Sequence, residues 1–273
     1  MLMPLAPHLQ PAPLPSASPT EMVAGSQSEV APAEFEQLGR LTAACTALGL
    51  GLDETLLLRL LDYLRMLQRW NKVYNLTAMR NTEQMLSHHL IDCLAMLPPL
   101  RGWIHQRSRA VATPASQAKP HSKSPRLLDV GSGGGLPGVV LALTQPDWRL
   151  SCVDTVAKKA SFIKQVAVEL GLPNLLGLHA RVENLAAPPA EQAGGTAGYD
   201  LITSRAFASL VDFTRLSAHL LAPDGIWLAM KGRTPDDEQA ELPPTIEVFH
   251  VEQLQVPGVD AQRCLVWLRR RRV

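Results

Sequence analysis

Hydrophobic residues recur at helical spacing in the first part of the chain, before any strand-like run appears. A stripe of leucines over residues 56–67 marks one helix, and Asp53 directly before it is suited to cap the N-terminus. Asn81 and Gln84 have capping-box spacing before another helix, which the Pro-Pro pair after Leu97 is expected to end. The pattern predicts three helices, over residues 35–48, 54–70 and 85–97, within a helical N-terminal region at 34–104.

From Arg126 onward the pattern changes to short apolar runs that alternate with helical stretches. The runs are RLLDVG, RLSCVD, NLLGLHA, YDLITS and GIWLAMK, followed by two more near residues 246–251 and 263–268. Such alternation is typical of βαβ units on a largely parallel sheet. We therefore expect an α/β, Rossmann-like domain over residues 126–273, with helices flanking the sheet and a small helical extension before it.

Two irregular stretches lack this periodicity. Residues 1–33 are rich in Pro, Ala, Ser and Gln, which predicts a disordered tail. Residues 105–125 contain Arg and Lys but no acid, which predicts a flexible basic linker, with a phosphate-contacting arm as the alternative. The run of arginines from Arg269 to Arg272 is expected to be a solvated chain end, with RNA contact as the other reading.

The start of the chain lacks the features of a targeting sequence. The first basic residue is Arg40, so neither the basic start of a signal peptide nor the arginines of a mitochondrial presequence are present. No apolar run approaches the length of a membrane span. We therefore expect a cytoplasmic protein without a membrane partner.

Charge and cysteine content narrow the functional classes. Lys and Arg number 26 against 25 Asp and Glu, which excludes a wholly basic nucleic-acid binder and confines any RNA contact to local patches. The four cysteines lie far apart, at positions 45, 93, 152 and 264. This spacing argues against a zinc site and against a disulfide scaffold, so no metal is expected.

A glycine-rich turn follows the first expected strand, in the sequence LLDVGSGGGLPG over residues 127–138. Because glycine has no Cβ, Gly131, Gly133 and Gly135 allow the backbone to take positive φ and to approach a ligand closely. Asp154 ends the second strand, where an acid accepts hydrogen bonds from the ribose hydroxyls of an adenosine. The alternative is a tight structural turn beside a surface acid.

The register of the turn favours S-adenosylmethionine (SAM) as the cofactor. Asp129 gives the pattern D-x-G-x-G-x-G, whereas GGGLPG also matches the dinucleotide motif G-x-G-x-x-G. Pro137 stands where a dinucleotide site would present helix amides to pyrophosphate, and proline has no N–H to donate. An NAD-dependent oxidoreductase is therefore the disfavoured alternative.

Six segments stand in this order along the chain: WNKVYNLT at 70–77, HLID at 89–92, DVGSGGGLPG at 129–138, RVE at 181–183, SRAFA at 204–208 and MKG at 230–232. In these segments and their order the chain resembles the ribosomal small-subunit methyltransferase G family, RsmG, also called GidB. The resemblance implies a class I SAM-dependent methyltransferase fold. It also implies methylation of N7 of a guanine in 16S rRNA, at position 527 in the 530 loop, within the small ribosomal subunit.

The resemblance also implies which residues contact SAM. The family's cofactor positions correspond here to Gly131, Leu136, Val182, Glu183 and Arg205. The glycines would hold the methionine portion of SAM, and Val182 and Glu183 would flank its adenine. Arg205 would bind the cofactor carboxylate or the rRNA backbone, with a salt bridge at the sheet edge as the alternative.

Four further side chains are candidates for substrate contact. Lys231 follows the fifth strand and could approach a phosphate, or it is a solvated loop lysine. Asn75 could shape the entry to the site, or it has a simple turn role. Tyr74, together with Trp70, could stack on a base or pack at a helix end.

Methylation of N7 needs no general base, because this nitrogen of guanine is neutral and carries a lone pair. Catalysis then consists of alignment and electrostatics, and no catalytic residue is assigned. The sequence contains neither the Asn/Asp-Pro-Pro-aromatic motif of amino-group methylation nor a Pro-Cys nucleophile. A SAM enzyme acting on another RNA or on a small molecule remains the alternative, and a monomer satisfies every feature of the sequence.

Overall fold

The computed structural model describes residues 32–111, 124–190, 197–205, 207 and 209–271. The tail expected over residues 1–33 lies almost wholly outside these residues, as do positions 112–123 of the expected linker. Positions 191–196 lie outside them as well.

Seven strands form one sheet in the order β3-β2-β1-β4-β5-β7-β6. The strands are β1 (Arg126–Val130), β2 (Arg149–Asp154), β3 (Leu175–His179), β4 (Tyr199–Ser204), β5 (Leu221–Lys231), β6 (Ile246–Gln253) and β7 (Cys264–Arg270). The first five are parallel, whereas β7 runs antiparallel to both β5 and β6. This order, with its antiparallel β7, is that of the class I SAM-dependent methyltransferases, so the predicted fold is confirmed.

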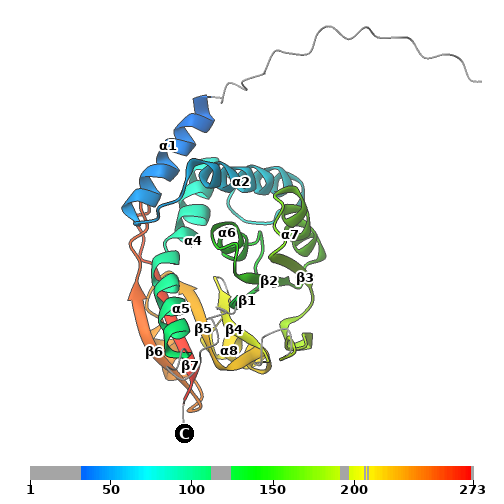
Figure 1. The fold of residues 1–273 in the computed structure, drawn as a ribbon, viewed down its shortest axis with the longest axis vertical. Coiled ribbons are helices and arrows are strands. Elements are labelled where there is room, and N and C mark those ends of the chain that lie inside the picture. Colours follow the sequence, from blue (N-terminus) through cyan, green and yellow to red (C-terminus); the bar gives the residue numbers. More distant parts are fainter. Residues whose placement is uncertain (1–31, 112–123, 191–196, 206, 208, 272–273) are drawn as a thin grey trace, which may run out of the picture.

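Helices cover both faces of the sheet (Figure 1). They are α1 (Pro32–Ala47), α2 (Glu54–Tyr74), α3 (Thr82–Met85), the π-helical η1 (Leu86–Ile91), α4 (Asp92–Leu94), α5 (Leu97–Val111), α6 (Gly138–Thr144), α7 (Ala157–Glu169), η2 (Val182–Asn184), α8 (Leu210–Ser217), η4 (Ala218–Leu220) and α9 (Asp236–Ala240). The helices α6 and α7 pack on β2 and β3, with α2 across them, whereas α8 and η2 lie on the opposite face.

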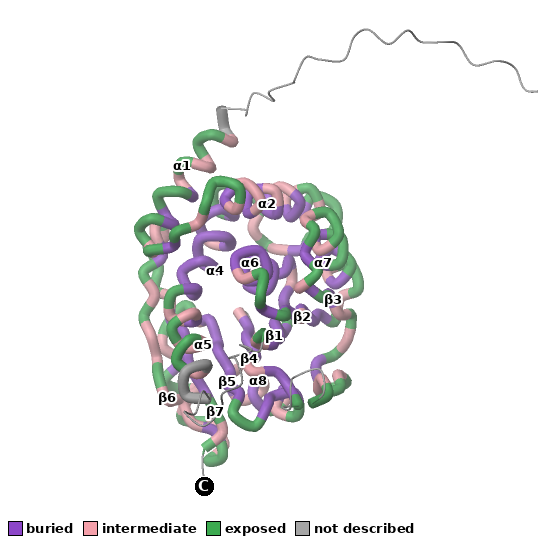
Figure 2. Tube along the Cα trace, viewed as in Figure 1, coloured by how far each residue is buried: buried purple, intermediate pink, exposed green. Residues whose placement is uncertain are grey.

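Successive residues of the central strands belong to different cores. Leu127 packs with the cluster that includes α2, α6 and α7, and Leu128 packs with the cluster around α8. All five residues of β1 are buried, as expected for a parallel strand covered on both faces (Figure 2). Because these strands are buried on both faces, their sequences are almost continuously apolar.

The predicted helix caps are present. Asp53 accepts a hydrogen bond from the backbone N–H of Leu56 at 2.8 Å, and Asn81 accepts from the N–H groups of Glu83 and Gln84. The capped helix α2 continues past the expected end at Trp70 and stops at Tyr74. Asn75 then adopts the left-handed conformation with φ 50°, which asparagine tolerates better than most residues.

The single helix expected over residues 85–97 is wrong in two respects. It is divided into α3, η1 and α4, because the backbone passes through a π-helical turn. The Pro-Pro pair does not end helical structure, since α5 begins at Leu97 and carries both prolines in its first turn. Proline is compatible with that position because the first N–H groups of a helix have no intrahelical acceptor. The helix continues to Val111, so residues 105–111 are helical and not part of a linker.

The N-terminal helices share one continuous core with the sheet. The hydroxyl of Tyr63 on α2 donates a hydrogen bond to the backbone carbonyl of Gly134 at 2.6 Å. A Cβ on Gly134 would lie 2.7 Å from Leu67, so this glycine permits the close approach of α2. Trp70 and Phe162 join α2 to α7, with ring centroids 5.4 Å apart. The helix α2 therefore rests directly on the glycine-rich turn.

We expect the substitution Tyr63→Phe to lower the free energy of unfolding by about 1 to 3 kcal/mol, because it leaves the buried carbonyl of Gly134 without its donor. The ring remains, so the packing against Phe162 is retained. Urea denaturation of both proteins measures the difference. An unchanged midpoint and slope would contradict a role for this hydrogen bond in holding α2 on the turn.

Candidate functional site

The parallel arrangement of β1 to β5 brings the carboxyl ends of these strands to one edge of the sheet. Most of the site residues predicted from the sequence lie at this edge, in the spatial order η2, Asp154, the glycine turn, Arg205 and Lys231. Neighbouring strands are about 4.8 Å apart, so β3 and β5 are separated by about 19 Å across the sheet. Ligands of open α/β sheets bind at this edge.

The glycine turn has the backbone conformation that the sequence predicted. Gly131, Gly133 and Gly135 have φ values of 68°, 57° and 86°. A Cβ on Gly131 would meet no atom within 4 Å, and one on Gly133 would meet only carbonyl oxygens at 4.0 Å. Open space therefore lies against these two glycines, as the close approach of a ligand requires. Gly135 is instead buried, where a Cβ would lie 2.4 Å from Val139.

Asp129 fixes the far side of the turn. Its Oδ2 accepts a hydrogen bond from the backbone N–H of Gly138 at 2.9 Å, and the side chain is fully buried. Burial raises the pKa of Asp129 to about 7, although the Gly138 N–H and the charge of Arg205 oppose the shift. The carboxylate thus maintains the turn and does not face the open side.

Asp154 is held in place by backbone donors at the end of β2. Its Oδ2 accepts from the N–H of Gly133 at 3.0 Å, and its Oδ1 accepts from the N–H of Val156 at 2.9 Å. Lys159 lies 3.7 Å from the same carboxylate. Each oxygen of Asp154 retains a second lone pair, so the carboxylate beside the turn can still accept a hydrogen bond from a ligand.

Three further cofactor candidates differ in exposure. Leu136 is buried in the core beneath the turn, and Val182 is buried at the start of η2. Glu183 is exposed and pairs with Arg181 at 3.2 Å. A backbone hydrogen bond, assisted by Arg181, lowers the pKa of Glu183, so its carboxylate is ionised at neutral pH.

Arg205 is half-buried in a cluster of charged side chains around the buried Asp92, which the spacing of these residues in the sequence does not predict. Its Nη1 donates to the backbone carbonyl of His88 at 3.0 Å and lies 3.6 Å from Asp92. Asp92 also accepts from Nε of Arg263 at 2.9 Å. The salt bridge proposed as the alternative for Arg205 is thus present. Two arginines share one carboxylate, which leaves one positive charge in excess within this cluster.

His89 connects this cluster to the loop after α2. Its Nε2 lies 2.8 Å from Oγ1 of Thr77, and its Nδ1 lies 3.3 Å from Nη1 of Arg205. The same Nδ1 also lies 3.2 Å from the backbone carbonyl of His88, so the contact with arginine requires Nδ1 to accept, whereas the contact with the carbonyl requires it to donate. Burial, with the charge of Arg205, lowers the pKa of His89 to about 4. His89 is therefore neutral at physiological pH.

Residues missed by sequence reasoning hold the loop that follows α2. Asn71 accepts from the N–H of Thr77 at 2.8 Å and donates to the carbonyl of Met79 at 2.9 Å. Asp92 and Arg263 complete the cluster around Arg205. An acid within the apolar run HLIDCLAML was the one available signal, because a buried carboxylate requires a cationic partner.

The structure bears on the alternative readings of the substrate candidates Lys231 and Asn75. Lys231 donates to both carboxylate oxygens of Glu238, at 2.9 and 2.8 Å, so it is not the solvated loop lysine of the alternative reading. Asn75 has the turn role, as the left-handed residue that ends α2, and its Oδ1 accepts from Arg80 at 3.1 Å.

Of the arginines predicted to form a solvated chain end, Arg270 is instead anchored, since it donates to three backbone carbonyls. Arg269 and Arg271 are exposed, as that prediction expects, although Arg269 also pairs with Glu247 at 2.6 Å. Arg272 lies outside the described residues.

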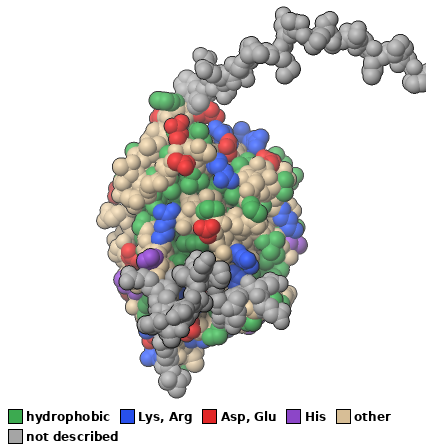
Figure 3. All heavy atoms as spheres, in the orientation of Figure 1, with side chains coloured by type: hydrophobic (Ala, Val, Ile, Leu, Met, Phe, Trp, Pro, Cys, Tyr) green, Lys and Arg blue, Asp and Glu red, His purple; other side chains and the backbone are tan. Residues whose placement is uncertain are grey.

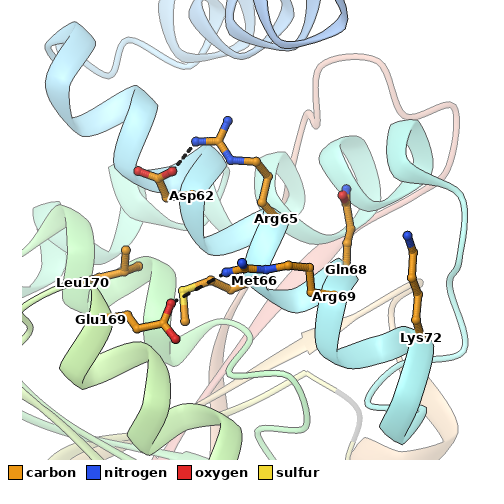
Figure 4. A pocket seen from close by; sticks show the side chains of 8 residues that line it. All are labelled: Asp62, Arg65, Met66, Gln68, Arg69, Lys72, Glu169 and Leu170. Carbon is orange, nitrogen blue, oxygen red and sulfur yellow. Dashed lines mark hydrogen bonds and ion pairs between the residues drawn. The ribbon is translucent and has the colours of Figure 1, made fainter. Parts of the chain in front are cut away.

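Two hollows on the surface lie away from the glycine turn. One, of about 520 Å³, lies between α2 and the end of α7 and is lined by Arg65, Arg69, Lys72 and Glu169, among others (Figure 4). The other, of about 550 Å³, lies beside Trp103 and Arg107 near the start of the long β5 strand.

Comparison with known proteins identifies the family. The profile of the family described as rRNA small subunit methyltransferase G matches residues 57–106 and 109–266. The chain belongs to this family. It is 56% identical over 229 residues to ribosomal RNA small subunit methyltransferase G of Acidovorax sp. (strain JS42), covering 84% of this chain and 93% of that protein. The same enzyme of Methylibium petroleiphilum is 51% identical over 243 residues, covering 89% and 99%.

The solved structures are less similar to this chain than the sequence relatives are. The structure of TrmN from Thermus thermophilus is 18% identical with a TM-score of 0.45, covering 68% of this chain and 53% of that one. A SAM-dependent methyltransferase from Thiobacillus denitrificans, in complex with S-adenosyl-L-homocysteine, is 14% identical with a TM-score of 0.38, covering 62% and 90%. The strand order, and not these similarities, identifies the fold.

The described part of the chain contains neither a candidate membrane span nor a candidate metal site. None of its helices is long and apolar enough to cross a membrane. No group of three or more His, Cys, Asp or Glu side chains among these residues could hold a metal ion.

The buried groups Asp129 and His89 predict opposite contributions to the pH dependence of stability. The raised pKa of Asp129 gives stability that is present below about pH 4 and lost as the pH rises to about 7, at most about 4 kcal/mol. The lowered pKa of His89 gives stability that is present above about pH 6.5 and lost as the pH falls towards 4. In the intact protein the two contributions partly cancel between pH 4 and 6.5.

We therefore expect Asp129→Asn to make the unfolding free energy fall more steeply on acidification from pH 6.5 to 4.5, and His89→Gln to make it fall less steeply. Urea denaturation across this range measures the slopes, which are independent of the overall destabilisation that each substitution causes. Parallel curves for the three proteins would show that these two groups do not titrate as their burial requires.

Proposed function

We propose that this chain transfers the methyl group of SAM to N7 of a guanine in 16S rRNA, at position 527 of the 530 loop. Family membership supports the reaction and the substrate. The structural observation that carries the proposal is the glycine turn. Two positive-φ glycines border open space at the edge of a class I sheet, beside an acid held by the turn itself.

The residues at this edge fit SAM in the order in which they occur. The backbone of Gly131, Gly133 and Gly135, with Leu136 supporting the turn from below, would hold the methionine portion. Asp154 would accept hydrogen bonds from the ribose hydroxyls through its remaining lone pairs. Val182 and the exposed carboxylate of Glu183, on the far side of Asp154, would flank the adenine and accept its exocyclic amine.

The chemistry requires alignment and no proton transfer to a side chain. Bound SAM supplies an electrophilic methyl group on a sulfonium, and N7 of guanine supplies the lone pair. The nearest acid beneath the turn, Asp129, is fully buried and bonded to Gly138, so it serves the turn and does not act as a base. The chain contributes by fixing the two reactants in line and by excluding alternative orientations.

The side of the sheet edge at β4 and β5 carries Arg205 and Lys231, which would suit an RNA phosphate or the cofactor carboxylate. Arg205 has an excess positive charge around it and lies between the glycine turn and β5. It would bind the carboxylate of SAM or an RNA phosphate. Lys231, anchored by Glu238, would contribute a second cation for the backbone, and Asn75 would shape the entry by ending α2 beside the turn.

The proposed rRNA substrate also leads to a proposed ribosomal context, oligomeric state and cellular location. The target guanine would be presented within the small ribosomal subunit, the enzyme would act as a monomer, and the reaction would take place in the cytoplasm. The domain division follows the same scheme, with the SAM-binding part at 126–273 and the helical region at 34–104 supporting the glycine turn. A SAM-dependent enzyme for another RNA or a small molecule is the alternative.

The cofactor assignment can be tested with Gly133→Asp and a matched control. Gly133 and Gly171 have nearly the same φ, 57° and 56°, and neither would place a Cβ closer than 4.0 Å to another atom. Both substitutions introduce the same backbone strain and charge, but Gly171 lies in the turn after α7. We expect methyl transfer from labelled SAM to be lost only in Gly133→Asp. Full transfer by a folded Gly133→Asp protein would overturn the cofactor site.

The substrate assignment can be tested in cells. We expect 16S rRNA from a deletion strain to lack N7-methylguanosine at the target position, and the intact gene to restore it. Mass spectrometry of nuclease fragments measures the modification. Its persistence in the deletion strain would contradict the proposed substrate and leave the second SAM-dependent reading in place.

A further inference from the structure

The hollow of about 550 Å³ lies at the edge of the sheet opposite the glycine turn. Residues 223–226 at the start of β5 and residues 269–271, where the antiparallel β7 ends, line it together. The remaining lining residues are Trp103, Gln106 and Arg107 of α5 and Phe249 of β6.

Cations dominate the lining of this hollow. It contains four arginines and a single acid, Asp224, whereas the hollow between α2 and α7 contains three cations and two acids. On the described part of the face in Figure 3, Lys and Arg side chains lie among acidic and apolar ones. Because the whole chain has 26 Lys and Arg against 25 Asp and Glu, a polyanion can be attracted only by a local concentration of this kind.

Two of these arginines rest against aromatic rings. The guanidinium of Arg107 lies 5.4 Å from the centroid of the Trp103 ring. The guanidinium of Arg269 lies 4.9 Å from the centroid of the Phe249 ring. Both rings pack on the buried Trp267, each with its centroid 6.3 Å away. A guanidinium that rests on a fixed ring loses less freedom when it binds a phosphate, and its N–H groups can still donate.

The same two arginines form ion pairs that differ in their exposure to solvent. Arg107 donates to Asp200 at 3.1 Å, and its side chain is 26% exposed. Arg269 donates to Glu247 at 2.6 Å, and its side chain is 45% exposed. An exposed ion pair contributes little free energy, so an incoming phosphate can replace Glu247 as the partner of Arg269.

The other two arginines have no carboxylate partner among the residues that the structure describes. Arg270 donates to three backbone carbonyls, which hold its charge beside the hollow. Arg271 is exposed, and its backbone N–H donates to the carbonyl of Thr245 at 2.8 Å. Four arginines thus face three acids, Asp224 and the two ion-pair partners, so one positive charge is in excess.

We propose that this hollow binds the phosphate backbone of 16S rRNA at a distance from the target guanine, with Arg269 and Arg271 donating to the phosphate oxygens. Arginine can donate two parallel hydrogen bonds to one phosphate, and such charge-assisted bonds are stronger than neutral ones. Contacts to phosphate position an RNA without reading its sequence. The proposal rests on the proposed function, because it takes 16S rRNA as the substrate.

The position of the hollow indicates the size of the substrate. Ile226 at the hollow and Lys231 at the carboxyl edge are five residues apart on β5, which is about 17 Å. A substrate that reaches both must span this distance, so a mononucleotide cannot. A folded RNA can place its target guanine at the cofactor edge while another part of its backbone lies in the hollow.

The contact is tested by the kinetics of the double variant Arg269→Ala/Arg271→Ala on small subunits that lack the modification. We expect KM for the subunit to rise roughly tenfold, the effect of losing two exposed charge-assisted contacts. The kcat and the affinity for SAM stay close to those of the intact enzyme, because both side chains lie at the opposite edge of the sheet.

Two single variants complete this experiment. Arg271→Ala changes one exposed side chain beyond the end of β7, so the fold is retained, and we expect KM to rise roughly threefold. Lys164→Ala on α7 removes an exposed lysine that has no ion pair among the described residues, and it is expected to leave KM unchanged.

The chemical class of the partner is tested by the salt dependence of binding to protein-free 16S rRNA. We expect Arg271→Ala to reduce the slope of log Kd against log salt by about one, because one phosphate contact is lost. Lys164→Ala is expected to have the slope of the intact enzyme.

The outcomes separate this hollow from the proposed function. If the intact enzyme methylates 16S rRNA and the arginine variants have the same KM, the hollow does not bind the substrate and the function stands. If the intact enzyme does not methylate 16S rRNA, the proposed function itself fails. A higher KM for the subunit with an unchanged slope for the protein-free rRNA would assign the hollow to a ribosomal protein, which overturns the RNA assignment.

Discussion

The hydrogen bond from the N–H of Gly138 to the buried carboxylate of Asp129 determines the shape of the site. It ties the start of α6 to β1 and so closes the glycine turn between them. A Cβ on Gly138 would lie 2.2 Å from Cys152 and 3.0 Å from Asp129, so only glycine permits this contact. Because the turn is fixed from behind, Gly131 and Gly133 can face open space in a conformation that few other residues adopt.

Acidic and basic side chains stand on different sides of this turn along the sheet edge. Asp154 and Glu183 lie on the side of β2 and β3, where Lys159 and Arg181 pair with them. Arg205 and Lys231 lie on the side of β4 and β5, where Lys231 is paired with Glu238. An adenosine with its hydroxyls and amine suits the first side, since these groups donate hydrogen bonds. In the proposed site a carboxylate or a phosphate would suit the second side, where two arginines share the carboxylate of Asp92.

The helix α2 contacts the glycine turn directly and is linked to Arg205 through the loop that follows it. Its buried face supports the turn through Tyr63 and Leu67, and its last residues, 72–74, are exposed. The loop after it is fixed by Asn71 and Thr77, and Thr77 is linked through His89 to Arg205. The N-terminal helices therefore share one core with the sheet and support the glycine turn directly.

The sequence by itself determined the features that depend on neighbouring residues. Hydrophobic period gave the seven strands, side-chain oxygens at Asp53 and Asn81 gave the caps, and the absence of a Cβ gave the positive φ of the glycine turn. Only the tertiary structure decided the π-helical turn at η1, the helix that begins at the Pro-Pro pair and the anchoring of Arg270. The cluster of Arg205, Asp92 and Arg263 belongs to the same group, since Asp92 and Arg263 are 171 positions apart. Local patterns record the conformational preferences of the backbone, whereas a buried charge finds its partner only when the packed chain brings distant segments together.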